Sequence, residues 1–427
     1  MEKTTKKKKA GRNAVIRHPK GRRVKQTAFT EVGALLGDKP RTRDSLIEFL
    51  HLVQDKYNCL TQSHLAALAH ELKISFAEVY EVATFYAHFD VVKDSDPPMP
   101  KLTIRVCDSL SCEMQGAQSL LVDLLEKAGK DIRVLPAPCM GRCDHAPVAE
   151  IGHYHVEKAS TASVLDAVKK GEFSPEIPAY TDFRKYREDG GYDLLWDCLT
   201  DAYSPDEIID TLSQSELRGM GGAGFPAGQK WGFVLKEPGP RLMTINADEG
   251  EPGTFKDKFY LETDPHRFLE GMMIAAWAVE ATDVYIYLRD EYPGVRKILQ
   301  TEIAKIEAAG LSDRTHIHLR RGAGAYICGE ESAMLESIEG KRGLPRHRPP
   351  YISTIGLFGR PTLNHNVETV FWIRDIIEKG AHKFADQGRH DRKGLRSYSV
   401  SGRIKNPGVK LAPAGTTMNE LIEEFCG

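Results

Sequence analysis

The chain has 427 residues, more than one hydrophobic core usually serves, so the sequence predicts two or three domains. Its composition, 41% hydrophobic and 28% charged with 37 glycines, is ordinary for a soluble globular protein. No run of eighteen apolar residues occurs and the N-terminus has no apolar core segment, which argues against a membrane span and a secretory signal.

The formal net charge of -2 is unevenly distributed along the chain. Residues 1–25 hold eleven Lys or Arg against Glu2 alone, about +10, which leaves about -12 for the remainder. We expect residues 1–35 to form a basic flexible arm. Such an arm could contact nucleic acid, but a solvated tail is the favoured interpretation, so no nucleic-acid partner is predicted. Eight cysteines are too few for a disulfide scaffold of this size and favour a cytoplasmic protein.

The predicted elements follow in chain order. Residues 36–95 contain apolar residues at helical spacing and predict a helical bundle. Residues 96–172 alternate strand, helix and strand and predict a small α/β unit. Residues 173–194, rich in proline and polar side chains, predict a linker. Residues 195–395 alternate strands with crossover helices, the pattern of a parallel sheet, and residues 396–427 predict two strands and a helix.

Two cysteine pairs stand at the ends of consecutive strand-like runs in the small α/β unit. TIRVCDSLSC carries Cys107 and Cys112, and DIRVLPAPCMGRC carries Cys139 and Cys143, with 26 residues between the pairs. Four thiolates brought to one sheet edge can hold a soft metal centre. The spacings C-x4-C and C-x3-C differ from a zinc ribbon and from a plant-type ferredoxin. They favour an iron–sulfur cluster, and leave a zinc knob or two buried thiol pairs as alternatives.

Three segments of the larger α/β region carry candidate ligand-binding chemistry. ELRGMGGAGFPAGQKW is rich in glycine, which lets backbone N–H groups approach a phosphate or a flat ring, and Lys230 adds a positive charge. INADEGEPGTFKDK clusters acidic side chains just beyond a strand, where open α/β sheets bind ligands. RRGAGAYICGEE leads into a helix that opens with two glutamates, which the helix dipole favours in any protein.

Together these motifs resemble the NADH-oxidising flavoprotein subunit of respiratory complex I, here fused to the thioredoxin-like 2Fe–2S subunit of the same complex. The fused arrangement, with HNVETVFWIRDI and GRHDRKGLRSYSVSGRIKNPGVKLAPAG, is most similar to diaphorase (beta) subunits of soluble NAD-dependent molybdenum formate dehydrogenases. The diaphorase subunit of an NAD-reducing hydrogenase and a complex I-like NADH dehydrogenase are alternatives. A non-catalytic iron–sulfur scaffold is an alternative of another class.

The resemblance implies a thioredoxin-like 2Fe–2S domain over 96–172, a Rossmann-like FMN- and NAD(H)-binding domain over 195–395 and a ubiquitin-like (β-grasp) unit over 396–427. The implied partners are NAD(H), a molybdopterin-containing catalytic subunit and a small 2Fe–2S subunit. Hydride transfer would be carried by FMN, with no catalytic side chain. The implied cluster ligands are Cys107, Cys112, Cys139 and Cys143. The implied cofactor-binding residues are Gly219, Gly221, Gly222, Ala223, Gly224, Phe225, Lys230, Phe233, Asn246, Asp248, Glu249, Glu251, Tyr326, Gly329, Glu330, Glu331, His365 and Asn366.

Within that set, Phe225, Phe233, Glu251 and Glu331 are expected to face the nicotinamide nucleotide, and the carboxylates would favour NAD over NADP. His365 replaces the first Asn of the family's NNVET segment, which puts one flavin contact in question. The family also continues into a helical domain with cysteines for a 4Fe–4S cluster. Those ligands are absent from this sequence, so we expect the chain to end before that domain.

Overall fold

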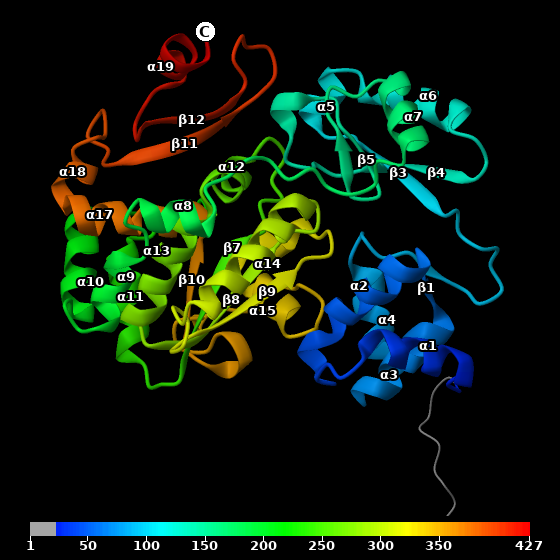
Figure 1. The fold of residues 1–427 in the computed structure, drawn as a ribbon, viewed down its shortest axis with the longest axis horizontal. Helices are drawn as coiled ribbons and strands as arrows, with labels where there is room; N and C mark the ends of the chain where they lie inside the picture. The colour runs from blue at the N-terminus through cyan, green and yellow to red at the C-terminus, as the bar shows by residue number, and fades with distance from the viewer. Residues whose placement is uncertain (1–22) are drawn as a thin grey trace, which may run out of the picture.

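The computed structural model describes residues 23–427, which fold into a helical bundle, a small four-stranded domain and a larger α/β domain (Figure 1). Most of the basic arm predicted over 1–35 lies outside the described residues. Its last part was assigned wrongly, because helix α1 spans Gln26–Leu36 and buries Val32 and Leu36 in the bundle core.

The bundle packs four helices around Leu50, Leu68 and Val82, which are fully buried. Its helices are α1, α2 (Leu46–Tyr57), α3 (Gln62–Leu72) and α4 (Phe76–Phe85). The Ser75 hydroxyl accepts a hydrogen bond from the Glu78 amide and the Glu78 carboxylate binds back to Ser75, a reciprocal cap that fixes the start of α4. A two-residue parallel pairing of β1 (Leu60–Thr61) with β2 (Val91–Val92) closes the bundle.

The small domain is a four-stranded sheet in the order β4-β3-β5-β6, flanked by three helices. Its strands are β3 (Leu102–Cys107), β4 (Ile132–Ala137), β5 (Ala149–Ile151) and β6 (Tyr154–Val156), and its helices are α5 (Leu110–Met114), α6 (Ala117–Lys127) and α7 (Thr161–Lys170). Because β3 and β4 are parallel, with Cys107 opposite Ala137, both carboxyl ends lie at the same edge. The sheet thereby brings the two cysteine pairs to one place.

The predicted linker is only partly a linker. Helix α8 (Phe183–Glu188) lies inside it and α9 (Asp193–Leu199) begins at its end. Tyr186 on α8 is buried, and its hydroxyl donates a 2.5 Å hydrogen bond to Glu270 in the core of the larger domain. The linker prediction therefore fits the proline-rich residues before α8, but not α8 itself, which packs through the buried Tyr186.

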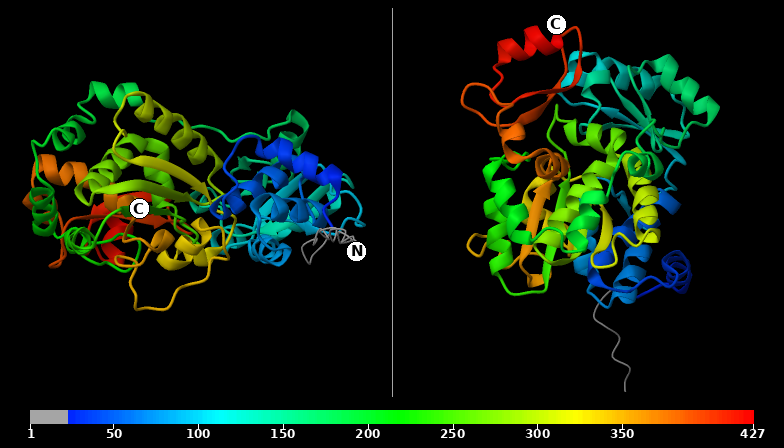
Figure 2. Two further views of the ribbon diagram at one scale, coloured as in Figure 1. Left: turned by 90° about the horizontal axis from the view of Figure 1, so that it is seen from below. Right: turned by 60° about the vertical axis from the view of Figure 1, so that its left-hand side comes forward.

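The larger domain is built on a parallel sheet in the order β10-β7-β8-β9, covered by helices on its faces (Figures 1 and 2). Its strands are β7 (Arg241–Ala247), β8 (Ala281–Leu288), β9 (His316–Arg321) and β10 (Thr362–Asn366). Its helices are α10 (Pro205–Gln214), α11 (Ala227–Lys236), α12 (Lys256–Thr263), α13 (Pro265–Ala278), α14 (Pro293–Ala308), α15 (Glu331–Ile338), α16 (Val367–Phe371), α17 (Ile373–Lys379) and α18 (Ala381–Ala385). The predicted α/β class is confirmed. All four strands end at one edge, since Asn366 pairs with Asn246, and Leu288 with both Ala247 and Arg321.

The C-terminal segment forms an antiparallel hairpin of β11 (Leu395–Val400) and β12 (Gly408–Pro413), followed by α19 (Met418–Glu420) and a π-helical turn, Leu421–Cys426. The hairpin lies above the larger domain and beside the small one (Figures 1 and 2). It contacts both: Ser399 Oγ accepts a 3.0 Å hydrogen bond from the Phe255 amide, and Ser401 Oγ lies 2.9 Å from Ser111 Oγ. The ubiquitin-like assignment of this unit stays a prediction.

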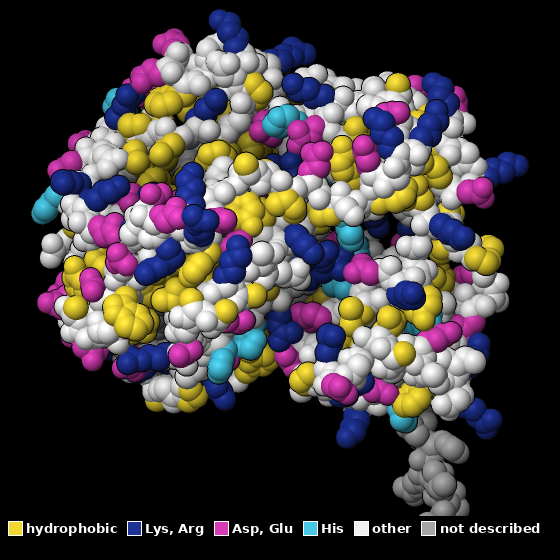
Figure 3. Space-filling view, viewed as in Figure 1, with side chains coloured by type: hydrophobic (Ala, Val, Ile, Leu, Met, Phe, Trp, Pro, Cys, Tyr) yellow, Lys and Arg dark blue, Asp and Glu magenta, His cyan; other side chains and the backbone are white. Residues whose placement is uncertain are grey.

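Across residues 23–427, no helix combines the length and apolar character needed to cross a bilayer. On the face seen in Figure 3, Lys and Arg side chains are interspersed with Asp and Glu. That face carries no broad field of one sign.

Candidate functional site

The four cysteines predicted to hold a cluster lie together at the carboxyl edge of the small domain's sheet. All four are buried. Cys139 Sγ is 3.3 Å from Cys143 Sγ, and the Cys107 thiol faces both Cys112 and Cys139. The Gly141 amide lies 3.4 Å from Cys139 Sγ and donates to it. Four soft ligands shielded from water, with a backbone amide directed at sulfur, suit an iron–sulfur cluster.

The cysteine loop packs directly on the larger domain. Phe255 clusters with Cys139 and Cys143, and the Gly253 amide faces the thiols of the same two cysteines. Gly141 has φ +65°, and a Cβ added there would lie 2.3 Å from the Tyr292 hydroxyl oxygen. Glycine at 141 therefore permits both the turn of the loop and its close approach to the neighbouring domain.

The glycine-rich loop forms a short hairpin-like turn between Arg218 and Pro226, just before α11. The Gly219 amide donates to the Phe225 carbonyl at 2.9 Å, which closes the turn. Gly222 and Gly224 have φ values of +120° and +66°, which favour glycine. A Cβ built at either would meet no atom within 4 Å, so the tip of the loop is open to a ligand. Ala223 lies between them at this tip.

Gly221 sets the distance between this loop and the end of β10. A Cβ added at 221 would lie 3.1 Å from the Asn366 Cβ. Asn366 in turn donates through Nδ2 to Asp257 at 2.5 Å and accepts through Oδ1 from the Glu368 amide at 3.1 Å. The Asn366 side chain therefore positions the segments around it. The glycine loop can approach Asn366 this closely because residue 221 has no side chain.

Phe225 on the loop, Phe233 and Lys230 on α11, and Tyr326 beside Gly250 supply aromatic and charged groups to the site. Phe225 and Phe233 are 43% and 50% exposed, with their ring centroids 6.1 Å apart, and Tyr326 is 63% exposed. Lys230 donates to the Asn364 carbonyl at 2.9 Å and lies 3.6 Å from Glu331, and burial lowers the pKa of Lys230. Exposed aromatic faces beside a charged pair offer stacking surfaces and polar contacts to a flat, polar ligand.

The acidic residues beyond β7 divide into two groups. Asp248 lines a cavity at this sheet edge. Burial raises its pKa to about 7, although the Arg289 charge acts to lower it. Glu251 is exposed. The Glu249 carboxylate instead accepts from the Asp257 amide at 3.0 Å and from the Tyr292 hydroxyl at 3.0 Å. Glu249 therefore caps the start of α12.

Asn246 and Glu330 are similarly engaged with the protein. Asn246 Nδ2 donates to the Gly329 carbonyl at 2.7 Å, which ties the end of β7 to the loop before α15. Glu330 is the N-cap of α15 and accepts from the Ser332 and Ala333 amides, each at 2.9 Å. These side chains hold the loops that line the site.

His365 is buried, and its Nε2 accepts a 2.6 Å hydrogen bond from the Trp231 indole. Because an indole N–H only donates, the neutral ring must carry its proton on Nδ1. Burial and the charge of Lys230 lower its pKa well below the usual value. The substitution of histidine for asparagine is thus accommodated as a neutral ring that is anchored on helix α11.

A cavity of about 400 Å³ separates the motif loops from the cysteine domain. Of the predicted cofactor residues, it is lined by Asp248 and Tyr326. Pro136 and Pro138 line it from the small domain, and Arg289 from the end of β8. Sequence reasoning missed Arg289 and Tyr292. The charged run beyond β8, at the same sheet edge as the acidic motif, was the signal that could have found them.

Comparison with known proteins identifies the two domains that carry these sites. Residues 212–375 match the model of the Nuo51 FMN-binding domain, and residues 32–172 match that of the thioredoxin-like [2Fe-2S] ferredoxin. The alpha subunit of the NAD-reducing hydrogenase HoxS of Cupriavidus necator is 34% identical, over 89% of this chain and 69% of that protein. The chain belongs to the same family as this hydrogenase subunit, with a Nuo51-type FMN-binding domain and a thioredoxin-like 2Fe–2S domain. The predicted FMN and 2Fe–2S cofactors are confirmed, and the zinc knob is set aside.

Further relatives agree with this assignment. An NADH-quinone oxidoreductase subunit of Aquifex aeolicus is 45% identical over 58% of this chain and 60% of its own length. The chain spans a similar share, 59%, of an NADH-quinone oxidoreductase subunit of Rhizobium meliloti. A crystal structure of an air-oxidized NAD+-reducing [NiFe]-hydrogenase superposes with a TM-score of 0.77 at 30% identity, over 90% of this chain and 70% of that one. The similarity to the hydrogenase subunit and structure therefore extends over the bundle, the cluster domain and the flavin domain together, whereas the Nuo51 model matches the flavin domain alone.

Proposed function

We propose that this chain is an NADH-oxidising diaphorase subunit, which exchanges electrons between NAD(H), FMN and its 2Fe–2S cluster. The observation that supports this most is the arrangement of the two sites. The glycine loop, Lys230 and Asp248 lie along one edge of the flavin-domain sheet, and Arg289 joins that edge to the cysteine loop. Bound FMN would accept electrons in a pair and release them singly, which links nicotinamide to an iron–sulfur centre.

The residues of the chain would bind and orient the reactants. The open tip at Gly222 and Gly224 would receive the flavin phosphate or ring, and Lys230 would supply a positive charge beside it. Phe225 and Phe233 would stack on the nucleotide. Glu251 and Glu331 would accept hydrogen bonds from ribose hydroxyls and repel a 2′-phosphate, so we propose NAD(H) rather than NADP(H) as the substrate.

The test compares flavin binding by a variant of the glycine loop with flavin binding by a variant of the neighbouring helix α11. Gly221→Ala places a methyl group against Asn366 and should weaken FMN binding and NADH-dependent ferricyanide reduction together. Gly232→Ala, on α11 where a Cβ would meet nothing within 4 Å, is the matched control and should retain both. Equal flavin affinity and equal activity in the two variants would contradict the proposed binding site.

The physiological donor is the finer part of the proposal. We propose formate, oxidised at a separate molybdopterin subunit with a small 2Fe–2S subunit, because the fused motifs and the segment through residue 415 resemble those of formate dehydrogenase diaphorases. The 34% identity to a hydrogenase subunit supports hydrogen as the second candidate. Purification of the native assembly should show molybdenum and formate-dependent NAD reduction. Nickel and hydrogen-dependent reduction would favour the second candidate.

A further inference from the structure

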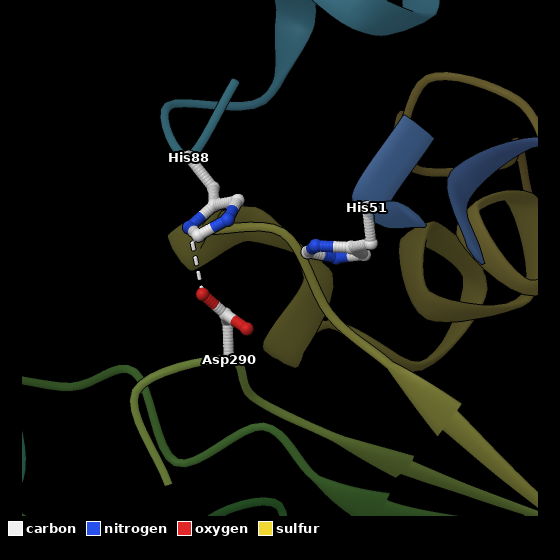
Figure 4. Close-up of side chains that lie close together, drawn as sticks. All are labelled: His51, His88 and Asp290. Atoms are coloured by element: carbon white, nitrogen blue, oxygen red, sulfur yellow. Dashed lines mark ion pairs between the residues drawn. The ribbon is translucent and has the colours of Figure 1, made fainter. Parts of the chain in front are cut away.

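Two histidines and an aspartate meet at the junction between the helical bundle and the flavin domain (Figure 4). His51 lies on α2, His88 follows α4, and Asp290 follows β8. One ligand atom from each of the three side chains lies within 4.8 Å of the others. His51 is only 2% exposed, and the side chains of His88 and Asp290 are 13% and 10% exposed. The cluster lies outside the cysteine and flavin sites.

The hydrogen bonds of the two rings fix which nitrogens are free. His51 Nε2 lies 2.8 Å from the Gly322 carbonyl, which only accepts, so Nε2 carries the proton and Nδ1 keeps its lone pair. His88 Nδ1 lies 2.7 Å from Asp290 Oδ2. Among the described residues, His51 Nδ1 and His88 Nε2 are buried without a hydrogen-bond partner. A buried polar atom left unsatisfied costs about 1–3 kcal/mol, so the free lone pair of His51 Nδ1, which faces His88 and Asp290, suits a bound ion.

The cluster contains a carboxylate, Asp290, that can contact a cation directly. The other oxygen of Asp290 pairs with Arg321, and the Arg321 guanidinium also binds the Asp55 carboxylate at 2.6 Å. The Asp290 and Asp55 carboxylates are balanced by the Arg321 and Arg296 guanidinium groups when both imidazoles are neutral. The Gly322 carbonyl that orients His51 is the kind of partner that metal-ligating histidines require for their second nitrogen.

We propose that His51, His88 and Asp290 bind a divalent transition metal ion of the zinc class, which fastens the helical bundle to the flavin domain. Two imidazoles and one carboxylate suit zinc, whereas calcium and magnesium prefer oxygen ligands alone. The ion takes the place of the proton between His88 Nδ1 and Asp290, and that proton moves to His88 Nε2, so the ring stays neutral. Zn–N bonds of about 2.0–2.1 Å require the side chains to draw together, and a water molecule completes the coordination.

The contact that this ion would fasten joins segments from three parts of the sequence. The backbone amides of Ala87 and His88 already donate to the Gly324 and Ala323 carbonyls at 3.2 and 3.1 Å. Metal binding adds a cross-link at the same contact, so zinc should raise the temperature at which bundle and flavin domain separate or unfold.

The test uses the full chain with its iron–sulfur cluster intact, treated with a chelator and then supplied with zinc. Wild-type protein should bind one zinc per chain, with an X-ray absorption first shell of nitrogen and oxygen at about 2.0–2.1 Å rather than sulfur at about 2.3 Å. His51→Gln and Asp290→Asn should lose this zinc. The matched control is His64→Gln, which removes a buried histidine of the same bundle that pairs with one carboxylate, Glu31, at 3.2 Å. This variant should keep the zinc.

The outcomes are distinct. Zinc lost only from the two cluster variants, together with a zinc-dependent rise in the wild-type melting temperature, supports the site. A sulfur shell, zinc retained equally by all variants, or no zinc bound by the wild type would overturn it. If the variants fail to fold, as circular dichroism would show, the first shell of the wild-type zinc still decides the question. The proposal does not depend on the proposed diaphorase activity.

Discussion

The Arg289 guanidinium donates a 2.5 Å hydrogen bond from Nη2 to the backbone carbonyl of Cys139. Its Nη1 donates to the Glu249 carbonyl in the acidic loop beyond β7, and the side chain is only 4% exposed. A guanidinium holds its donors in a rigid fork, so one side chain fixes the cluster loop relative to the loop that lines the flavin site.

Replacement of Arg289 by Met should loosen the cluster loop. The variant leaves two buried carbonyls without their charged donor, a loss of roughly 1.5–3 kcal/mol for each hydrogen bond to a charged group. We expect faster loss of iron in air and a lower melting temperature. Arg320→Met is the control, because Arg320 pairs with Asp44 far from the cysteines. It should lower stability without speeding iron loss. Equal rates of iron loss in both variants would show that Arg289 does not hold the cluster loop.

Replacement of Cys139 by Ser should remove most of the iron. The cysteine lies between Cys107 and Cys143 in the thiol group, and a hydroxyl is a poor ligand for a cluster. Iron and sulfide analysis should fall from about two of each per chain, and the EPR signal of the reduced 2Fe–2S cluster should disappear. Cys59→Ser, in the helical bundle, should keep both. A variant at 139 with full iron content would remove Cys139 from the ligand set.

Replacement of Glu331 by Gln should weaken NADH binding. Glu331 lies 3.6 Å from Lys230 and 3.0 Å from Arg348, so its carboxylate is held beside the glycine loop. One charged hydrogen bond is worth roughly 1.5–3 kcal/mol, about tenfold to a hundredfold in KM. Discrimination against NADPH should relax as well. Glu336→Gln, on the same helix but paired with Arg346, should leave KM unchanged. An unchanged KM in the Glu331 variant would place this residue outside the nucleotide site.

Asp248 should give the flavin-free protein a distinct pH dependence. Burial raises its folded-state pKa to about 7, against about 3.9 when unfolded. The folded state therefore binds the proton more tightly, and its stability falls as pH rises from about 4 to about 7. Asp248→Asn should be more stable than wild type at pH 8 and not at pH 4, as measured by denaturant unfolding.

Asp283→Asn is the matched control for that experiment. Burial alone would raise the pKa of Asp283, but hydrogen bonds from His318 and Thr282 bring it below the usual value. The folded state then favours the charged form, so this variant should lose stability above about pH 4, the opposite sign. The same pH profile in both variants would contradict a raised pKa at Asp248.

The sequence was sufficient to place the chemistry at strand ends. The runs ending at Cys107 and Ala137 are strands β3 and β4, and the acidic motif begins where β7 ends at Ala247. Strand periodicity and the rule that parallel strands share an edge were enough for this. The family models then confirmed the cofactor types.

The direction of each side chain could not be predicted from residue type. The resemblance assigns Glu249 and Glu330 to the flavin site, and the structure shows that both carboxylates also cap helices, α12 and α15. A carboxylate near the start of a helix can accept from the helix amides or from a ligand, and residue type alone does not show which it does. Contacts between distant segments, such as that of His51 with Asp290, could not be predicted either, because no local sequence pattern encodes them.

The central claim is that the flavin site of this chain oxidises NADH. The most direct measurement is an anaerobic titration of the FMN-loaded chain with NADH, followed by flavin absorbance. We predict that the flavin absorbance is bleached by about one equivalent of NADH, and far less readily by NADPH, because Glu251 and Glu331 would repel a 2′-phosphate. Bound flavin that stays oxidised in excess NADH would contradict the account.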